Sequence, residues 1–342
     1  MRHRTCIAVQ TLACAAALIA APGLSHHATA PAYDMGQIIE LTGEITEVSW
    51  RNPHIHLTLQ TGDEGGDVGT WDLETNSVSV VSRFGVSADL VAPGTRVRVA
   101  GSPGRVNERS LWLTNVLLED GREVLFGSAY LPRWTQQTVG AADTRGAITA
   151  DVTGTLGIFR VWTSIGGGGV LWNDSYPFTP EAAAVRAAFD PVRDDPTLNC
   201  ALKGMPLIME QPYPMEFVDE DDEILLRLEE YDTVRRIVMT DHESVRARPA
   251  SLLGNSTGRW EDGVLVVETT GIDYPWFNKT GIPQSDAVHI VERYALNADG
   301  SRLGYEMTVT DPATFTEPVV LTKSWGYRPN DEVRPYECAP EN

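Results

Sequence analysis

Four histidines near the N-terminus have the types and spacing of a metal site: His26, His27, His54 and His56. His54 and His56 lie two residues apart on an expected strand, so their side chains face the same side. A histidine at a free N-terminus offers its α-amine and a ring nitrogen to one ion, and a second imidazole completes a nitrogen-rich set that suits Cu(II). The sequence therefore predicts a site for copper or another divalent metal.

The first of these ligands depends on where a leader peptide is removed. Cleavage after Ser25 would make His26 the N-terminus, whereas cleavage one residue earlier would leave a Ser-His-His tail that also binds Cu(II) or Ni(II). Glu74 and Asp34 are the nearest carboxylate candidates for orienting the metal-binding rings. The competing interpretation is a His-His tail with two strand histidines that only make hydrogen bonds.

Ionisable residues within alternating strands of the C-terminal half form a second candidate site. In one such strand His289 and Arg293 share a face and Glu292 lies on the other, so either orientation buries an ionisable group. A buried carboxylate has a raised pKa and can act as general acid or base, and a buried arginine can hold an anionic group. Glu268 with Arg293, or Arg259 with Glu292, would form a polar cluster.

This pattern supports an enzyme in the C-terminal half. Glu292 or Glu268 would move the proton in its reaction. Arg293 or Arg259 would orient the substrate, and His289 is a further acid–base candidate. The competing interpretation is a Glu–Arg pair that satisfies itself and fixes the register of the strands.

Ser256 and a set of aromatic residues complete the candidates. Gly254–Gly258 has the spacing of a nucleophile elbow, but it precedes an expected strand instead of opening a helix, so we expect Ser256 to be a turn residue. Aromatic rings in loops and strand ends would line a pocket for a hydrophobic or carbohydrate ligand, or pack in the core. They are Trp134, Trp162, Trp172, Trp276, Phe277 and Trp325.

The composition is that of a globular protein with an acidic surface. The chain of 342 residues is 42% hydrophobic, and its 27 Lys and Arg against 47 Asp and Glu give a net charge of −20. Such a charge repels phosphate backbones and anionic lipid heads, and no basic patch interleaved with aromatics compensates for it. We therefore expect a small-molecule ligand or a metal ion as partner, and no nucleic acid.

Residues 1–25 have the pattern of a secretory signal peptide. Arg2 and Arg4 give it a positive start, and the apolar run that follows is uninterrupted from Leu12 to Ala21. This run is too short for the roughly 30 Å of a bilayer core, and no second apolar run of about 18 residues follows it. We expect export to the periplasm or the cell exterior, with no membrane span.

Export determines which cysteines remain in the mature protein. Cys6 and Cys14 would leave with the leader, so that Cys200 and Cys338 remain. Two cysteines in an oxidising compartment predict one disulfide, with a pair of free thiols as the alternative. The disulfide would close a loop of about 138 residues and attach the C-terminal tail to the C-terminal domain.

The first expected domain, residues 26–126, consists of short alternating strands separated by Gly, Asp and Pro. Five strands in about 90 residues suit a small OB-like barrel, with a sandwich as the alternative. Asn76–Leu90 has the apolar residues for the single helix that such barrels place between strands three and four. The expected strands are Glu44–Trp50, His54–Leu59, Thr70–Glu74, Arg96–Ala100 and Ser110–Leu118.

A linker at 127–156 and a second β-rich domain at 157–342 are expected to follow. Pro180–Phe189 predicts a short helix, which Thr179 can cap. Six or more consecutive meandering strands then suggest a larger β-barrel-like domain, either calycin-like or a curved sheet. These strands are Glu223–Glu229, Arg235–Thr240, Gly263–Thr269, His289–Ala295, Leu303–Thr310 and Val319–Trp325, with a solvated hairpin tip at 219–223 and a turn at 297–300.

A series of small motifs resembles a known family. The motifs are His26-His27, Tyr33-Asp34, Leu41-Thr42-Gly43-Glu44-Ile45, Trp50-Arg51-Asn52-Pro53-His54, a Trp71/Glu74 strand and Pro93-Gly94. In this order they resemble the domain of unknown function numbered 6152, common in exported proteobacterial proteins, over about residues 25–125. The segment Gly254–Thr269 and the later Glu292-Arg293-Tyr294 look like a recurrent exported module. Neither resemblance implies a known reaction.

The sequence thus favours an exported, mainly β, two-domain protein that binds a small ligand and, through its N-terminal histidines, copper or another divalent metal. The alternative is an enzyme of hydrolase, isomerase or lyase type, acting on a hydrophobic small molecule in the C-terminal barrel. A structural protein of the envelope is the third interpretation. A metal module predicts His54 and His56 on one face, and an enzyme predicts a water-accessible cavity that touches Glu292 and Arg293.

Overall fold

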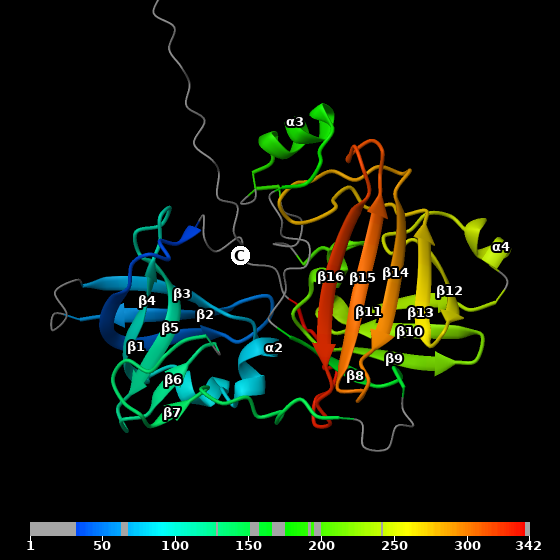
Figure 1. The fold of residues 1–342 in the computed structure, drawn as a ribbon. Helices are drawn as coiled ribbons and strands as arrows, with labels where there is room; N and C mark the ends of the chain where they lie inside the picture. Colours follow the sequence, from blue (N-terminus) through cyan, green and yellow to red (C-terminus); the bar gives the residue numbers. More distant parts are fainter. Residues whose placement is uncertain are drawn as a thin grey trace, which may run out of the picture.

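Two β-barrels lie side by side in the protein (Figure 1). The structure is a computed structural model that describes residues 32–62, 68–127, 129–150, 157–165, 175–190, 193–194, 200–240 and 242–338. The expected leader, His26, His27 and Trp172 lie outside these residues. Within them, no helix is long and apolar enough to cross a membrane.

The N-terminal barrel confirms the expected OB-like fold. Its described strands are β1 (Ile39–Ser49), β2 (Ile55–Thr61), β3 (Gly69–Thr75), β4 (Arg96–Pro103) and β5 (Ser110–Leu118). They pair in the order β3-β2-β1-β4-β5, and a parallel pairing of β3 with β5 closes the ring. In β2, Ile55, Leu57 and Leu59 are buried, because alternate side chains point into the barrel.

The helix expected at Asn76–Leu90 is shorter than predicted. It consists of one turn, α2 (Val78–Val81), followed by the 3-10 turns η2 (Ser82–Phe84) and η3 (Ala88–Val91). Gly85 ends η2 in the left-handed conformation with φ of 77°, which glycine adopts without steric cost. Its position between strands three and four is as expected.

Part of the segment expected as a linker packs on the N-terminal barrel. The strands β6 (Glu123–Leu125) and β7 (Thr138–Val139) extend the sheet beyond β5. The buried carboxylate of Glu123 accepts backbone N–H groups of Arg133, Trp134 and Thr135 at 2.8 to 3.1 Å. These hydrogen bonds attach the chain after β6 to the first barrel.

The C-terminal part forms a closed barrel, as expected for a β-barrel-like domain. Nine strands of the described chain close in the order β10-β11-β12-β13-β14-β15-β16-β8-β9. They are β8 (Val161–Ser164), β9 (Met215–Glu220), β10 (Glu223–Leu228), β11 (Thr233–Val238), β12 (Asn255–Glu261), β13 (Val264–Thr270), β14 (His289–Leu296), β15 (Arg302–Thr310) and β16 (Val319–Gly326). The six expected strands are confirmed, and β8, β9 and β12 are additional.

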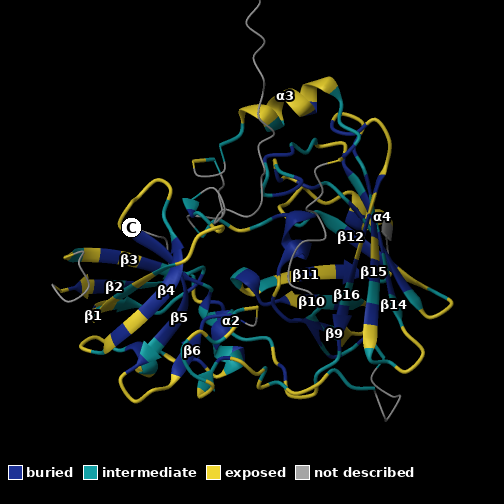
Figure 2. Cartoon of the chain, turned by 60° about the vertical axis from the view of Figure 1, so that its left-hand side comes forward, coloured by how far each residue is buried: buried dark blue, intermediate teal, exposed yellow. Residues whose placement is uncertain are grey.

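The meander of this barrel is interrupted once among the described strands. β11 and β12 are parallel neighbours, and the connection between them contains α4 (His242–Arg246). The expected short helix with its Thr179 cap is confirmed. In α3 (Pro180–Ala188) the Thr179 hydroxyl accepts the N–H of Ala182 at 3.2 Å. The helix lies outside the barrel and is largely exposed (Figure 2).

The interior of the C-terminal barrel is filled by its own chain. The 3-10 turn η5 (Leu207–Glu210) is completely buried, and its apolar side chains belong to the same core cluster as Trp162, Tyr294 and Trp325. Lys323 of β16 donates to the carbonyls of Met209 and Gln211, at 3.1 and 2.8 Å. This segment therefore acts as a plug in the barrel.

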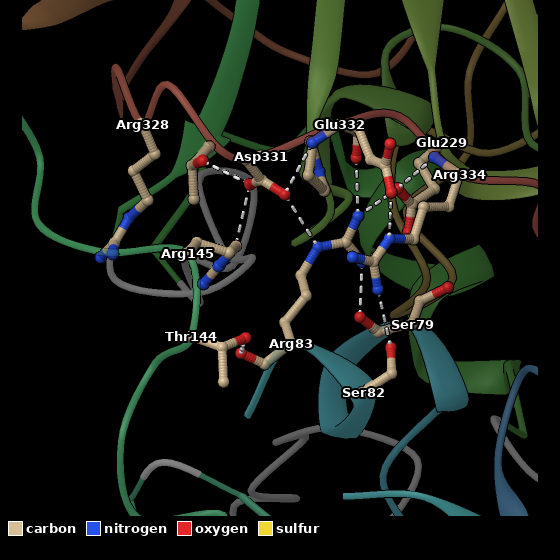
Figure 3. A network of polar contacts seen from close by, with 12 residues as sticks. Ser79, Ser82, Arg83, Thr144, Arg145, Glu229, Arg328, Asp331, Glu332 and Arg334 are labelled. Atoms are coloured by element: carbon tan, nitrogen blue, oxygen red, sulfur yellow. Dashed lines mark hydrogen bonds and ion pairs between the residues drawn. The ribbon is translucent and has the colours of Figure 1, made fainter. Parts of the chain in front are cut away.

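A buried ionic network joins the two barrels (Figure 3). The guanidinium of Arg83 in η2 pairs with the carboxylates of Glu229 and Asp331 at 2.6 and 3.1 Å. Arg145 also contacts Asp331, at 3.1 Å. The side chains of Glu229 and Asp331 are both 0% exposed, so these two carboxylates are shielded from water.

The chain after β16 runs from this network along the N-terminal barrel. The side-chain amide of Asn52 donates to the carbonyl of Tyr336. Cys338 then forms the expected disulfide with Cys200, with a Cα–Cα distance of 5.9 Å. The tail is thus held by both barrels.

Candidate functional site

His54 and His56 lie on the outer face of the N-terminal barrel, each beside a carboxylate. The Nδ1 atom of His54 is 2.5 Å from Oε1 of Glu74, and the Nδ1 atom of His56 is 3.4 Å from Oδ1 of Asp72. Both carboxylates belong to β3, the neighbour of β2. Asp72 and Glu74 alternate with the buried Trp71 and Leu73, so both histidines contact the outer face of β3.

These contacts set the orientation of the imidazole rings. The Nδ1 atom of His56 is within hydrogen-bond distance of Asp72, and the Nδ1 atom of His54 lies against the Glu74 carboxylate. Metal-binding histidines usually have a carboxylate beside the ring in this way. The Tyr33 hydroxyl donates to Oε2 of Glu74 at 2.6 Å, and the His54 ring packs edge-on against Trp112 with centroids 5.5 Å apart. Burial and the Glu74 carboxylate raise the pKa of the Tyr33 phenol, so Tyr33 remains a donor.

The other carboxylate expected at this site has different partners. Asp34 accepts hydrogen bonds from Arg105 at 2.9 Å and from Gln37 at 2.8 Å, since these side chains flank it on the surface. Within the described residues, no group of three or more His, Cys, Asp or Glu side chains is placed to hold a metal ion. A complete metal site would therefore need ligands from outside them, such as His26 or His27.

In the C-terminal barrel, Glu292 is the member of the expected acid–base set that points inward. Its carboxylate is 0% exposed and pairs with the guanidinium of Arg235, which is 1% exposed. The hydroxyls of Tyr294 and Tyr305 donate to Oε1 of Glu292 at 2.9 and 2.7 Å. Burial and Glu292 raise the pKa values of both phenols far above their usual range, so both stay protonated.

The predicted pairs, Glu268 with Arg293 and Arg259 with Glu292, do not form. Arg259 pairs with Glu268 at 2.7 Å, and Arg293 pairs with Glu261 at 3.0 Å, on the outer surface of the barrel. The reason is strand alternation, which puts Glu292 on the face opposite to Arg293. His289 has the parity of Arg293, so it shares the outer face and does not join Glu292.

Ser256 is also placed differently from the expectation. It lies within β12 and is buried, and its hydroxyl accepts from Nε of Arg235 at 3.0 Å. Thr269 of β13 accepts from the same guanidinium at 2.6 Å. Arg235 and Glu292 thus satisfy each other among hydroxyl groups, with no exposure to solvent. This arrangement supports the interpretation of a pair that fixes strand register rather than a catalytic acid.

The expected set of aromatic residues divides between core and surface. Trp162, Phe277 and Trp325 are buried in the barrel core, which fits the packing interpretation. Trp134 and Trp276 are half-buried. Trp260, which the sequence did not single out, is 47% exposed.

A second buried ionic cluster in the C-terminal barrel was missed from the sequence. Lys203 donates to Oε1 of Glu230 at 2.7 Å, and Glu210 and Lys323 are buried beside them. Burial raises the pKa of Glu210 to about 7, although Lys279, Lys203 and Lys323 oppose this shift. Burial also lowers the pKa of Lys323 to about 8, against the effect of Glu210. Both groups therefore titrate near neutral pH.

The signal for this cluster was the position of the charges within apolar patterns. Lys323 alternates with Leu321 and Trp325, so it shares their inward face. Glu210 follows the apolar run from Leu207 to Met209. A charged residue in an inward register is the feature that identifies such a group.

We expect Glu210→Gln to stabilise the protein at pH 8 and to change nothing at pH 4. The folded state raises the pKa of Glu210 from 4.5, so it binds the proton more tightly than the unfolded chain. Stability therefore falls as pH rises from about 4.5 to 7, by about 3 kcal/mol. Glutamine carries no charge and avoids this loss, which urea unfolding at the two pH values measures.

A suitable control is Glu216→Gln, because Glu216 belongs to an exposed ion pair with Arg227. This variant is expected to change stability by less than about 1 kcal/mol at either pH. If Glu210→Gln behaved like Glu216→Gln, or destabilised the protein more at pH 8 than at pH 4, the Glu210 assignment would be wrong.

The first barrel, with its histidine face, is thus a small β-domain joined to a larger plugged barrel. Residues 13–111 match the model of a family of unknown function, DUF6152. His54, His56, Asp72 and Glu74 lie within the match, and the C-terminal barrel lies outside it. No curated protein and no solved structure matches the chain.

Proposed function

We propose that this is an exported binding protein whose N-terminal barrel holds a divalent metal ion, Cu(II) by preference, on its outer face. The observation that carries the proposal is the pair of histidine–carboxylate contacts, His54 with Glu74 and His56 with Asp72. Metal-binding histidines usually make such a contact through the second ring nitrogen. The proposal is that these two imidazoles bind one ion together.

We propose that the chain upstream of Tyr33 supplies further ligands. Tyr33 is hydrogen-bonded to the same Glu74 that contacts His54. Five residues lie between His27 and Tyr33, so the two Cα atoms can be at most about 20 Å apart along an extended chain. The α-amine and imidazole of a mature N-terminus at His26 would add nitrogen donors of the kind that Cu(II) prefers.

Two further features support an exported cation-binding protein. The disulfide between Cys200 and Cys338 is of a kind that persists in oxidising compartments such as the periplasm. The formal net charge of −20 attracts cations over the whole surface. Residues 1–25 supply the pattern of a leader peptide for that route.

The test is a Cu(II) titration of the mature protein, purified from the periplasm after expression with its own leader. We expect one tightly bound ion, and weakening of at least about 100-fold in His54→Ala and His56→Ala. Glu74→Gln is expected to weaken binding about 10–100-fold, because it only orients the ring. Electron paramagnetic resonance of the bound ion should show nitrogen ligands that decrease in the histidine variants.

His289→Ala is the matched control, since this histidine lies on the outer face of the other barrel. It is expected to bind Cu(II) like the wild type. The intact mass of the mature protein establishes whether it starts at His26. Equal affinities in His54→Ala, His56→Ala and His289→Ala would refute the proposed site, as would a wild type that binds no Cu(II).

A further inference from the structure

The hairpin turn between β9 and β10 borders a cleft in the C-terminal barrel. The cleft has a volume of about 480 Å³. Its lining residues are Phe159, Asp219, Asp221, Ile224, Met239, Arg259 and Trp260. Clefts lined by aromatic and apolar side chains are common ligand sites, and this one is separate from the histidine face of the first barrel.

The wall of the cleft is aromatic. Trp260 has the parity of the buried Ser256 along β12, so its ring lies toward the inner side at the rim, where it is 47% exposed. Phe159 packs edge-to-face against it, with ring centroids 6.3 Å apart. An exposed indole braced by a second ring leaves an aromatic surface available to a ligand.

The floor of the cleft is apolar and depends on a glycine. Ile224 is buried, and Met239 packs beside it against the core. A Cβ atom at Gly258 would lie only 2.5 Å from the sulfur of Met239, so any larger residue at 258 would displace the Met239 side chain. The floor therefore suits the apolar part of a ligand.

The charge at the rim is negative. The carboxylates of Asp219 and Asp221 are exposed, and neither has a hydrogen bond or an ion pair with any residue that the structure describes. Arg259 does not compensate them, because its guanidinium is held by Glu261 at 2.8 Å and by Glu268 at 2.7 Å. An anionic ligand would thus be repelled here, and a cation attracted.

We propose that this cleft binds an organic cation that carries apolar groups on its nitrogen, such as a quaternary ammonium compound. The face of an indole ring attracts such a cation, and the attraction increases when the ligand is partly desolvated. Asp219 and Asp221 supply the opposite charge, and Ile224 and Met239 contact the apolar substituents. The site is independent of the metal site of the first barrel.

Isothermal titration with choline and with its carbon isostere tests the proposal on the intact mature protein. The two probes differ only in the replacement of the charged nitrogen by carbon. We expect choline to bind about tenfold more tightly than the isostere, with a change in Trp260 fluorescence. Trp260→Leu keeps an apolar side chain but removes the ring, and should weaken choline binding about fivefold.

The charge is tested by the double variant Asp219→Asn/Asp221→Asn, which should weaken choline binding about tenfold. Asp222→Asn is its matched control, because Asp222 lies in the same hairpin turn but does not line the cleft, and it should change binding less than about twofold. Thermal unfolding establishes that each variant is folded. Equal binding of choline and its isostere, no binding of choline, or equal effects of the double variant and Asp222→Asn would each overturn the proposal.

Discussion

Arg83→Met is expected to lower the free energy of unfolding by about 3–5 kcal/mol. The guanidinium of Arg83 is the cation between two buried carboxylates, Glu229 and Asp331 (Figure 3). It also donates to the carbonyls of Ser79 and Glu332, at 2.5 and 2.9 Å. Methionine fills a similar volume but leaves both carboxylates without this cation, so the cost of burying their charge is no longer offset.

The same variant should uncouple the barrels. We expect calorimetry to resolve two unfolding transitions in Arg83→Met where the wild type unfolds as one unit, because the network spans the interface. Arg83→Lys keeps the charge without the planar fork and should have an intermediate effect.

The control for Arg83 is Arg98→Met, which removes an exposed ion pair with Glu40 on the surface of the N-terminal barrel. Its expected cost is below about 1 kcal/mol, as for other exposed pairs. If Arg83→Met unfolded at the same midpoint as Arg98→Met, the buried network would not contribute to the stability of the protein.

Glu292→Gln should have a comparable effect within the C-terminal barrel. It leaves the charge of Arg235 buried, at 1% exposure, without its counterion, and we expect a loss of about 3–5 kcal/mol. Glu261→Gln is the matched control, since Glu261 pairs with Arg259 and Arg293 on the surface. Urea unfolding of both variants measures the difference.

A double variant makes this prediction more specific. Arg235→Met/Glu292→Leu removes both charges at once, so neither is left uncompensated, and part of the stability lost in Glu292→Gln should return. The matching single variants are Arg235→Met and Glu292→Leu. If the double variant loses more unfolding free energy than these two lose together, the pair does not act as a mutually compensating unit.

The existence of most strands was predictable from the sequence, whereas their partners were not. Alternation in the strand that contains Glu292 showed that one charged residue must be buried. It did not show which face is interior, and it gave no indication of Arg235, which is 57 residues away in the sequence. The adjacent Arg235 and Arg236 carried a local signal, because two neighbours in a strand point to opposite faces and one of them must point inward.

The additional strands show where tertiary structure overrides local pattern. β12 contains Asn255, Ser256, Thr257 and Gly258, residues that are typical of turns. They form a strand because β11 and β13 pair with both of its edges. β8 has only four residues, too few for a recognisable alternation.

At the histidine face, the spacing of His54 and His56 predicted which way the side chains point but not which residues they contact. A separation of two residues predicted that His54 and His56 share a side, and both contact carboxylates of β3. Their carboxylate partners depend on the register of β2 against β3, in which His56 lies opposite Glu74 and Thr58 opposite Asp72. Register follows from the whole hairpin, so Asp72 was not identified in advance.

The tail from Asp331 to Cys338 has a consequence for the order in which the molecule is completed. It supplies an acid for Arg83, a carbonyl for Asn52 and one half of the disulfide. The ribosome makes these residues after every described strand of both barrels, although domains generally fold as they emerge. The first barrel can fold once its own strands have been synthesised, but the contacts between the barrels are complete only after residue 338 has been added. Before the tail is made, Glu229 can already pair with Arg83, but the second carboxylate of the network, Asp331, is still missing.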